Sequence, residues 1–110
     1  MPLTSPEGGM RYIKSWGEIE EVAAGPSVRK RVLPGAGASL VQVTIAPGVS
    51  APRHDHPHEQ FVQVLSGSGT LTTEEGERAF GPGDIFHFPP GTWHAATFTI
   101  ETVLVETNLA

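Results

Sequence analysis

Short runs that alternate between apolar and polar residues, separated by glycine and proline, fill the chain beyond residue 26. A run such as LVQVTI at 40–45 turns every second side chain to one face, which is typical of a β-strand. Runs of this kind predict strands at 28–33, 40–45, 61–65, 69–73, 78–80, 85–88, 95–100 and 102–106. Because turn-forming segments and no helices separate them, they predict an antiparallel sandwich or barrel.

The N-terminal part of the chain has a different pattern. Residues 1–9 are rich in proline, glycine and serine, and WGEIEEV at 16–22 is the only weakly helical stretch, too short to be stable alone. We therefore divide the chain into a flexible tail at 1–22 and a barrel domain at 23–110. Tyr12 and Trp16 lie outside the barrel, and a subunit interface would give them a place to pack, so the tail is also expected to act as a dimer arm in a homodimer.

Composition narrows the class of partner. The chain has 110 residues, which is one domain, and its net charge of −5 with no basic stripe argues against nucleic acid. It has no cysteine and no apolar run of the roughly 18 residues that span a bilayer, so we expect a cytoplasmic protein without a membrane partner. A small molecule is the expected ligand.

Histidines provide the candidate chemistry. His54 and His56 are two residues apart, so on a strand both imidazoles lie on one face and can reach a shared ion, although two solvated histidines would give the same pattern. Pro57 then interrupts the strand. Gln60 shares its parity with Val62, which places it on the core face. A second segment, GDIFHFPPGTWH at 83–94, brings His94 from a distant part of the chain.

These two segments resemble the two motifs of the cupin superfamily. The first motif, G(x)5HxH(x)3,4E(x)6G, is matched by Gly48, His54, His56, Gln60 and Gly67. The second motif, G(x)5PxG(x)2H(x)3N, is matched by Gly83, Pro89, Gly91 and His94. The chain departs from the pattern at Gln60, where the motif has Glu, and at Phe98, where it has Asn.

The resemblance implies an all-β fold, a double-stranded β-helix of the jelly-roll type with about nine short antiparallel strands. It also implies one divalent transition metal, Zn, Mn, Ni or Fe, held by His54, His56, His94 and Gln60. With a neutral amide in place of Glu, the 2+ charge of the ion is not compensated, which favours Lewis-acid chemistry. The HDHPHEQ string resembles that of small cupins that open unsaturated uronates, and it is also similar to that of some polyketide cyclases.

Several residues have two interpretations. Glu59 is an alternative fourth ligand, although strand alternation turns it outward. We expect His58 to be an exposed turn histidine and His87 to be a strand histidine with a partner, with a site role as the alternative for each. Glu106, on the apolar strand VLVETN, is the candidate general base, because the uronate-opening cupins carry an inward carboxylate at a comparable place.

The remaining candidates concern the substrate. We expect Val62, Trp93 and Phe98 to line the pocket. Arg29 and Arg31 share a face, where one arginine at the barrel mouth could bind a carboxylate, although a solvated face is the simpler interpretation.

These residues and the resemblance suggest three functions. The leading one is a metal-dependent enzyme for isomerisation, ring-opening or cyclisation of a sugar-acid or keto-type substrate. A dioxygenase with Fe, Ni or Cu is the second, and a non-catalytic ligand-binding or sensor cupin is the third.

Overall fold

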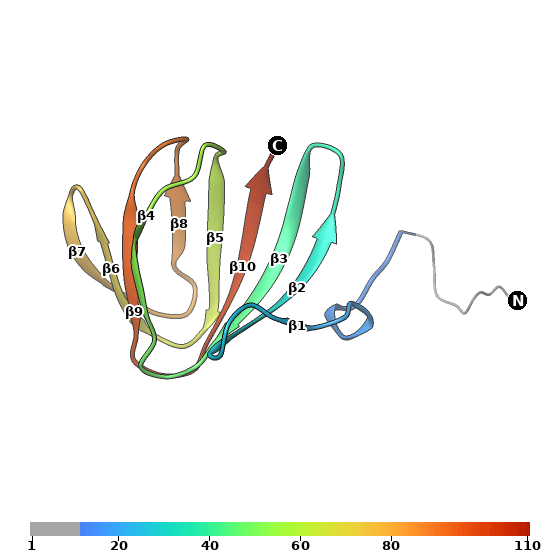
Figure 1. Cartoon of the computed structure of the whole chain (residues 1–110), viewed down its shortest axis with the longest axis horizontal. Coiled ribbons are helices and arrows are strands. Elements are labelled where there is room, and N and C mark those ends of the chain that lie inside the picture. Colours follow the sequence, from blue (N-terminus) through green and yellow to red (C-terminus); the bar gives the residue numbers. More distant parts are fainter. Residues whose placement is uncertain (1–11) are drawn as a thin grey trace, which may run out of the picture.

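The computed structural model describes residues 12–110, which form two facing antiparallel sheets (Figure 1). The described elements are the 3-10 helix η1 (Trp16–Glu18) and the strands β1 (Val22–Ala23), β2 (Val28–Pro34), β3 (Ala38–Ile45), β4 (Ser50–His54), β5 (Gln60–Ser66), β6 (Gly69–Thr73), β7 (Gly76–Phe80), β8 (Ile85–Phe88), β9 (His94–Phe98) and β10 (Thr102–Leu109).

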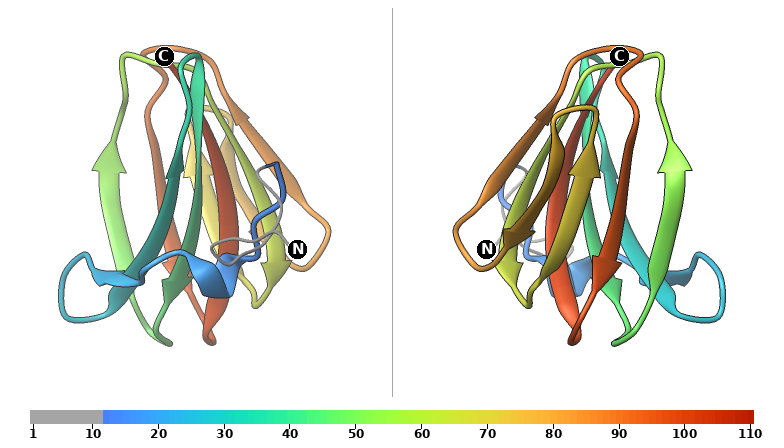
Figure 2. Two further views of the ribbon diagram at one scale, coloured as in Figure 1. Left: turned by 90° about the vertical axis from the view of Figure 1, so that its right-hand side faces the viewer. Right: turned by 90° about the vertical axis from the view of Figure 1, so that its left-hand side faces the viewer.

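The two sheets have the connectivity of a jelly roll. One is six-stranded in the order β1-β2-β3-β10-β5-β8, and the other is four-stranded in the order β4-β9-β6-β7. The predicted all-β, double-stranded β-helix is therefore confirmed. In both views of Figure 2 the strands draw together toward the end that carries the C-terminus.

The strand predictions fail mainly at β1 and β4. β4 reads SAPRH, with a proline and two basic side chains in place of an apolar alternation, and β1 has only two residues. The strand predicted at 95–100 ends at Phe98, because the amide of Thr99 donates to the carbonyl of Ser68 outside the ladder. The turn at 74–75 joins β6 to β7, and Gly76 has the expected positive φ of 108°.

The core lies between the sheets and comes from alternate residues of the strands. In β5 the burial pattern alternates strictly, with Gln60, Val62 and Val64 buried and Gln63 exposed. The buried apolar side chains are Val41, Val43, Ile45, Val62, Val64, Phe80, Phe88, Phe98 and Leu104. Each contributes on the order of 1.5–3 kcal/mol through burial, so this cluster accounts for the cohesion of the two sheets.

The segment before β2 is attached to the outside of the six-stranded sheet. Arg31 on β2 donates to the carbonyls of Ile19 at 2.5 Å and Trp16 at 3.3 Å, and β1 pairs with β2. The part of the predicted tail at residues 1–11 lies outside the described residues. Among those that are described, Tyr12 and Ile13 are exposed. No helix of the described chain is long and apolar enough to cross a membrane.

Candidate metal centre

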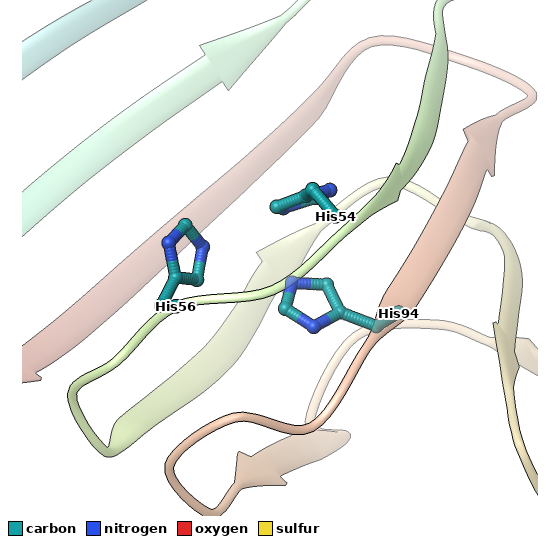
Figure 3. A group of neighbouring side chains, drawn as sticks. All are labelled: His54, His56 and His94. Carbon is teal, nitrogen blue, oxygen red and sulfur yellow. The ribbon is translucent and has the colours of Figure 1, made fainter.

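Three histidines converge at one end of the four-stranded sheet (Figure 3). His54 ends β4, His56 lies two residues further on, and His94 begins β9, directly opposite His54 in the strand register. One ring nitrogen from each lies within 4.8 Å of the others, a spacing that suits a shared metal ion. The structure thus brings together three of the four predicted ligands.

A backbone contact joins the two motifs beside this cluster. The amide of Gly91, in the Pro-Pro-Gly corner, donates to the carbonyl of His56 at 2.8 Å. Gly91 has a φ of 76°, a conformation that glycine adopts without strain. The corner itself is closed by Thr92, whose hydroxyl donates to the Pro89 carbonyl at 2.8 Å. The hydrogen bond from Gly91 to His56 thus holds the segment that leads to His94 against the HxH segment.

The ring orientations of two histidines are set by their neighbours. Nδ1 of His54 lies 2.8 Å from the Pro52 carbonyl. Since a carbonyl only accepts, Nδ1 carries the hydrogen, and the neutral ring keeps its lone pair on Nε2. The ring of His94 stacks on that of Phe88, with centroids 3.8 Å apart and planes within 3°. The aromatic wall therefore holds His94 in one plane.

Burial favours the neutral form of His94. Desolvation, followed by the nearby His54 and His56, lowers the pKa of His94 to about 4. The backbone of Thr92 and the carboxylate of Asp55 oppose this shift only weakly. A neutral imidazole is the protonation state that binds a metal, so His94 remains a competent ligand well into the acid range.

His56 is shifted in the same direction. Burial is the main cause of its lowered pKa, with His54 and His58 adding to the effect, while the carboxylates of Glu106 and Asp55 act against it. The contribution of Glu106 is informative because it places an inward carboxylate within electrostatic reach of the cluster.

The donor set fits a divalent transition metal. Nδ1 of His94 is buried and has no hydrogen-bond partner among the described residues. Figure 3 shows the other ring nitrogen of His94, Nε2, turned toward His54 and His56, so Nε2 is the atom that an ion in the cluster would meet. Three neutral imidazoles suit Zn, Ni, Mn or Fe, and the chain has no cysteine that would shift the preference toward soft ions.

Gln60 faces the interior at the start of β5 and is only 4% exposed. Its Nε2 donates to Oδ1 of Asn108 on β10 at 2.7 Å. This bond occupies the amide nitrogen and leaves Oε1, the only atom of the amide that can bind a cation. The role of Gln60 as fourth ligand stays a prediction. Sequence reasoning missed Asn108, although it shares the parity of Leu104 and Glu106.

Glu106 lies on the inner face of β10. It pairs with Val41 on one side and Val62 on the other, both of which are buried, and it follows the buried Leu104 by two residues. This parity agrees with the inward direction predicted for it. Its role as a general base stays a prediction.

Of the three remaining candidates, Glu59 and His87 agree with their simplest interpretations and His58 does not. Glu59 points away from the cluster, and its Oε2 lies 2.6 Å from Nε2 of the exposed His87, which also stacks on Phe61. His87 thus has the partner that was expected. The prediction that His58 is exposed is wrong: it is half-buried, stacks on His56 at 5.0 Å, and buries an unpartnered Nε2. The bend after Pro57 turns it inward.

The predicted pocket residues lie at different depths. Val62 is part of the core, and Phe98 packs against Phe80 at the far end of β9 from His94, about 13 Å along the strand. Trp93 is half-buried, with the guanidinium of Arg53 4.2 Å above its ring.

The predicted pair of arginines lies elsewhere. Arg29 and Arg31 do share a face, where both contact Glu21. That face is the outside of the six-stranded sheet, because their partners in β3 alternate with the buried Val41 and Val43. Neither arginine therefore lines the interior of the barrel.

The fold and the histidine cluster are those of a cupin. The family model for the cupin domain matches residues 41–105, and the chain belongs to this family. The matched range includes all three converging histidines.

Three similar proteins illustrate how broad the family is. A germin-like protein of Arabidopsis thaliana, subfamily 1 member 7, is 37% identical over 68 residues, which are 53% of this chain and 29% of that protein. The chain thus matches less than a third of that relative. An RmlC-like cupin from Shewanella frigidimarina has a TM-score of 0.82 at 20% identity and covers 91% of both chains. The polyketide cyclase RemF from Streptomyces resistomycificus has a TM-score of 0.77 at 19% identity, over 91% of this chain and 80% of that one. At these identities the two structures establish the shared fold alone.

Proposed function

We propose that the protein is a metal-dependent enzyme that isomerises, opens or cyclises a small sugar-acid or keto-type substrate by proton transfer. The single observation that carries this proposal is the convergence of ring nitrogens of His54, His56 and His94 within 4.8 Å, with the carboxylate of Glu106 close enough for its charge to act on His56. A cation site beside a half-buried carboxylate is the arrangement that acid–base chemistry on an oxygen-rich substrate requires.

The ligand set favours Lewis-acid chemistry. His54, His56, His94 and Gln60 would hold the ion, and none of these side chains contributes negative charge when it does so. A divalent ion bound there would stabilise negative charge that develops on a substrate oxygen. The aromatic ring of Phe88, stacked on His94, excludes water from one side of the cluster and lowers the local dielectric.

Glu106 would move the proton. Its carboxylate accepts a proton from a substrate carbon or hydroxyl next to a carbonyl group and returns it at a neighbouring position. Placement on a strand between two paired neighbours gives the carboxylate a fixed backbone, which general bases need. The resemblance of HDHPHEQ to the string of the uronate-opening cupins points to unsaturated uronates as one substrate class.

Metal content is the first test. Elemental analysis of the purified protein should give about one divalent ion per chain, and His56→Ala and His94→Ala should each lower that occupancy strongly. His87→Ala is the matched control, because His87 lies outside the cluster and pairs with Glu59. Full occupancy in both cluster variants would place the site elsewhere.

Proton transfer is the second test. With uronates and hydroxy-keto acids in D2O, nuclear magnetic resonance should detect deuterium exchange or product formation without oxygen uptake. Glu106→Gln should lower turnover by about 10²-fold to 10⁴-fold with metal retained, whereas the surface control Glu101→Gln should have no effect. Oxygen consumed in proportion to product would favour the dioxygenase instead.

A further inference from the structure

A cavity of about 700 Å³ opens between β7 and β8, the two edge strands that face each other without pairing. Its walls include Phe80, Phe86, Phe88 and Trp93. Phe88 also stacks on His94, so one aromatic ring separates the cavity from the histidine cluster. A ligand in this cavity would therefore lie beside the candidate metal centre, against apolar and aromatic surface.

Arg78 is the cation that faces this space. In the register of the four-stranded sheet, Leu71 pairs with Arg78 on one side and with Ala96 on the other, so all three side chains are on one face. That face is the inner one, because Leu71 and Ala96 pack against the core and Phe80, two residues along β7, is buried. Arg78 lines the cavity accordingly.

The position of Arg78 relative to the histidines follows from the same register. His94 is two residues from Ala96 on β9 and shares its inner face, so Arg78 lies two strands across and two residues along from His94. Those steps correspond to about 10 Å and about 7 Å between backbones. This separation between the Arg78 backbone and the cluster is one that a small molecule bound to the arginine could bridge.

Arg78 has no partner among the residues that the structure describes. Within residues 12–110 no ion pair, hydrogen bond or cation–π contact engages its guanidinium, whereas Arg29, Arg31 and Arg53 are all engaged. Arg78 is exposed and lines the aromatic-walled cavity without a carboxylate partner, so its guanidinium offers a planar donor fork to an anionic ligand.

The acidic residues around the cavity do not satisfy Arg78. Glu77 has the opposite parity on β7, and Glu74 and Glu75 form the hairpin turn at the rim. Asp84 is engaged in its own turn, where Oδ2 accepts the amide of Gly81 at 2.9 Å. Within residues 12–110 none of these carboxylates forms an ion pair with Arg78, although all four line the cavity.

We propose that Arg78 forms a carboxylate-binding subsite in this cavity, and that the substrates of this protein are carboxylic acids with a planar or apolar body. The inference deepens the proposed function and rests on it for the reaction. The carboxylate binds Arg78 and the body packs against Phe86 and Phe88, which places the substrate beside the histidine cluster.

The test uses phenylacetate, which carries a carboxylate and a ring, and the variant His56→Ala, which should lose the metal, shows whether the carboxylate binds the ion instead of Arg78. Binding is measured by ligand-observed nuclear magnetic resonance on the full chain, with phenylacetamide and phenethylamine as the neutral and cationic counterparts. We expect phenylacetate to bind the wild type and to lose about tenfold or more in affinity in Arg78→Gln, the loss of one charge-assisted contact. Arg29→Gln, on the outer face, should bind as the wild type does.

The outcomes separate this inference from the proposed function. His56→Ala should still bind phenylacetate, because the subsite does not depend on metal. Equal affinity in wild type and Arg78→Gln, no binding of phenylacetate, or tighter binding of phenethylamine would each overturn the subsite. Arginine-dependent binding in a protein that holds no metal would support the subsite and contradict the proposed metal enzyme.

Discussion

Gln60 and Asn108 face each other across the inner side of the six-stranded sheet, with Nε2 of Gln60 donating to Oδ1 of Asn108 at 2.7 Å. This bond determines which end of the Gln60 amide remains for other partners. An amide nitrogen cannot bind a cation, so the orientation that Asn108 imposes presents the oxygen. Asn108 is thus a positioning residue for the proposed fourth ligand.

Removing that constraint should weaken metal binding without abolishing it. In Asn108→Ala the Gln60 amide can rotate, and we expect the dissociation constant of the metal to rise by about tenfold, within the range typical of outer-sphere substitutions. Competition with a chromogenic chelator measures it. Asn108→Asp keeps an acceptor and should restore the affinity. An unchanged dissociation constant in Asn108→Ala would mean that Asn108 does not position Gln60 for metal binding.

Replacing Gln60 with Glu separates occupancy from reactivity. A carboxylate at this position partly compensates the charge of the ion, so Gln60→Glu should retain metal but turn over more slowly. Elemental analysis and the deuterium-exchange assay, run on the same sample, give the two readouts. Faster turnover in Gln60→Glu would contradict the Lewis-acid role.

Acid should destabilise the metal-free protein through His94. The folded pKa is about 4, whereas an unfolded histidine titrates near about 6.5, so the unfolded state binds more protons between these values. Stability should therefore fall as the pH drops through this window, by up to about 1.4 kcal/mol per unit for this one group. Thermal melts of chelator-treated protein measure the slope, which should be smaller in His94→Gln, and an equal slope in wild type and His94→Gln would contradict the role of this histidine.

The close packing around Gly69 can be tested through its effect on the free energy of unfolding. A Cβ atom there would lie 1.9 Å from the Thr97 carbonyl oxygen and 2.8 Å from Cζ of Phe80. Gly69→Ala must push β6 and β9 apart and should cost roughly 1–3 kcal/mol or more in the free energy of unfolding. Gly37→Ala is the control, because a Cβ at Gly37 has no atom within 4 Å. Equal denaturant midpoints would contradict the packing described for the four-stranded sheet.

The outer face of the six-stranded sheet suggests how a homodimer would form. Ile85 is 66% exposed and Leu65 is 49% exposed, and Phe61 lies on the same face. We propose that this face pairs two copies, so light scattering should give twice the chain mass of 11.7 kDa. Ile85→Lys should shift the mass toward one chain, whereas Ile100→Lys, in a loop, should not. A single-chain mass for the wild type would count against the dimer.

Periodicity predicts the strands that bury an apolar face and misses those that do not. The β5 run is found because Val62 and Val64 alternate with polar residues, whereas β4 carries Pro52 and Arg53 and is recognised only through its histidines. A strand at the edge of a sheet needs no apolar alternation to pair, so its sequence contains no such signal.

The spacing of residues in the sequence predicts only part of the candidate metal centre and its surroundings. His54, His56 and His94 stand in two motifs whose spacing is fixed by turns, so their convergence can be inferred from the sequence. Arg78 and Asn108 belong to no motif, and only the register between strands reveals that they face inward. Long-range pairing, which sequence reasoning does not supply, defines that part of the site.

The hydrogen bond from Gly91 to the carbonyl of His56 also bears on how the protein folds. It joins segments that are far apart in the chain, and so does the pairing of β4 with β9 beside it. Closing such a loop costs chain entropy before any contact is gained, so these pairings form late and slowly. The peptide that carries His54 and His56 has therefore no preformed third ligand, and metal can stabilise the chain only after the four-stranded sheet has assembled.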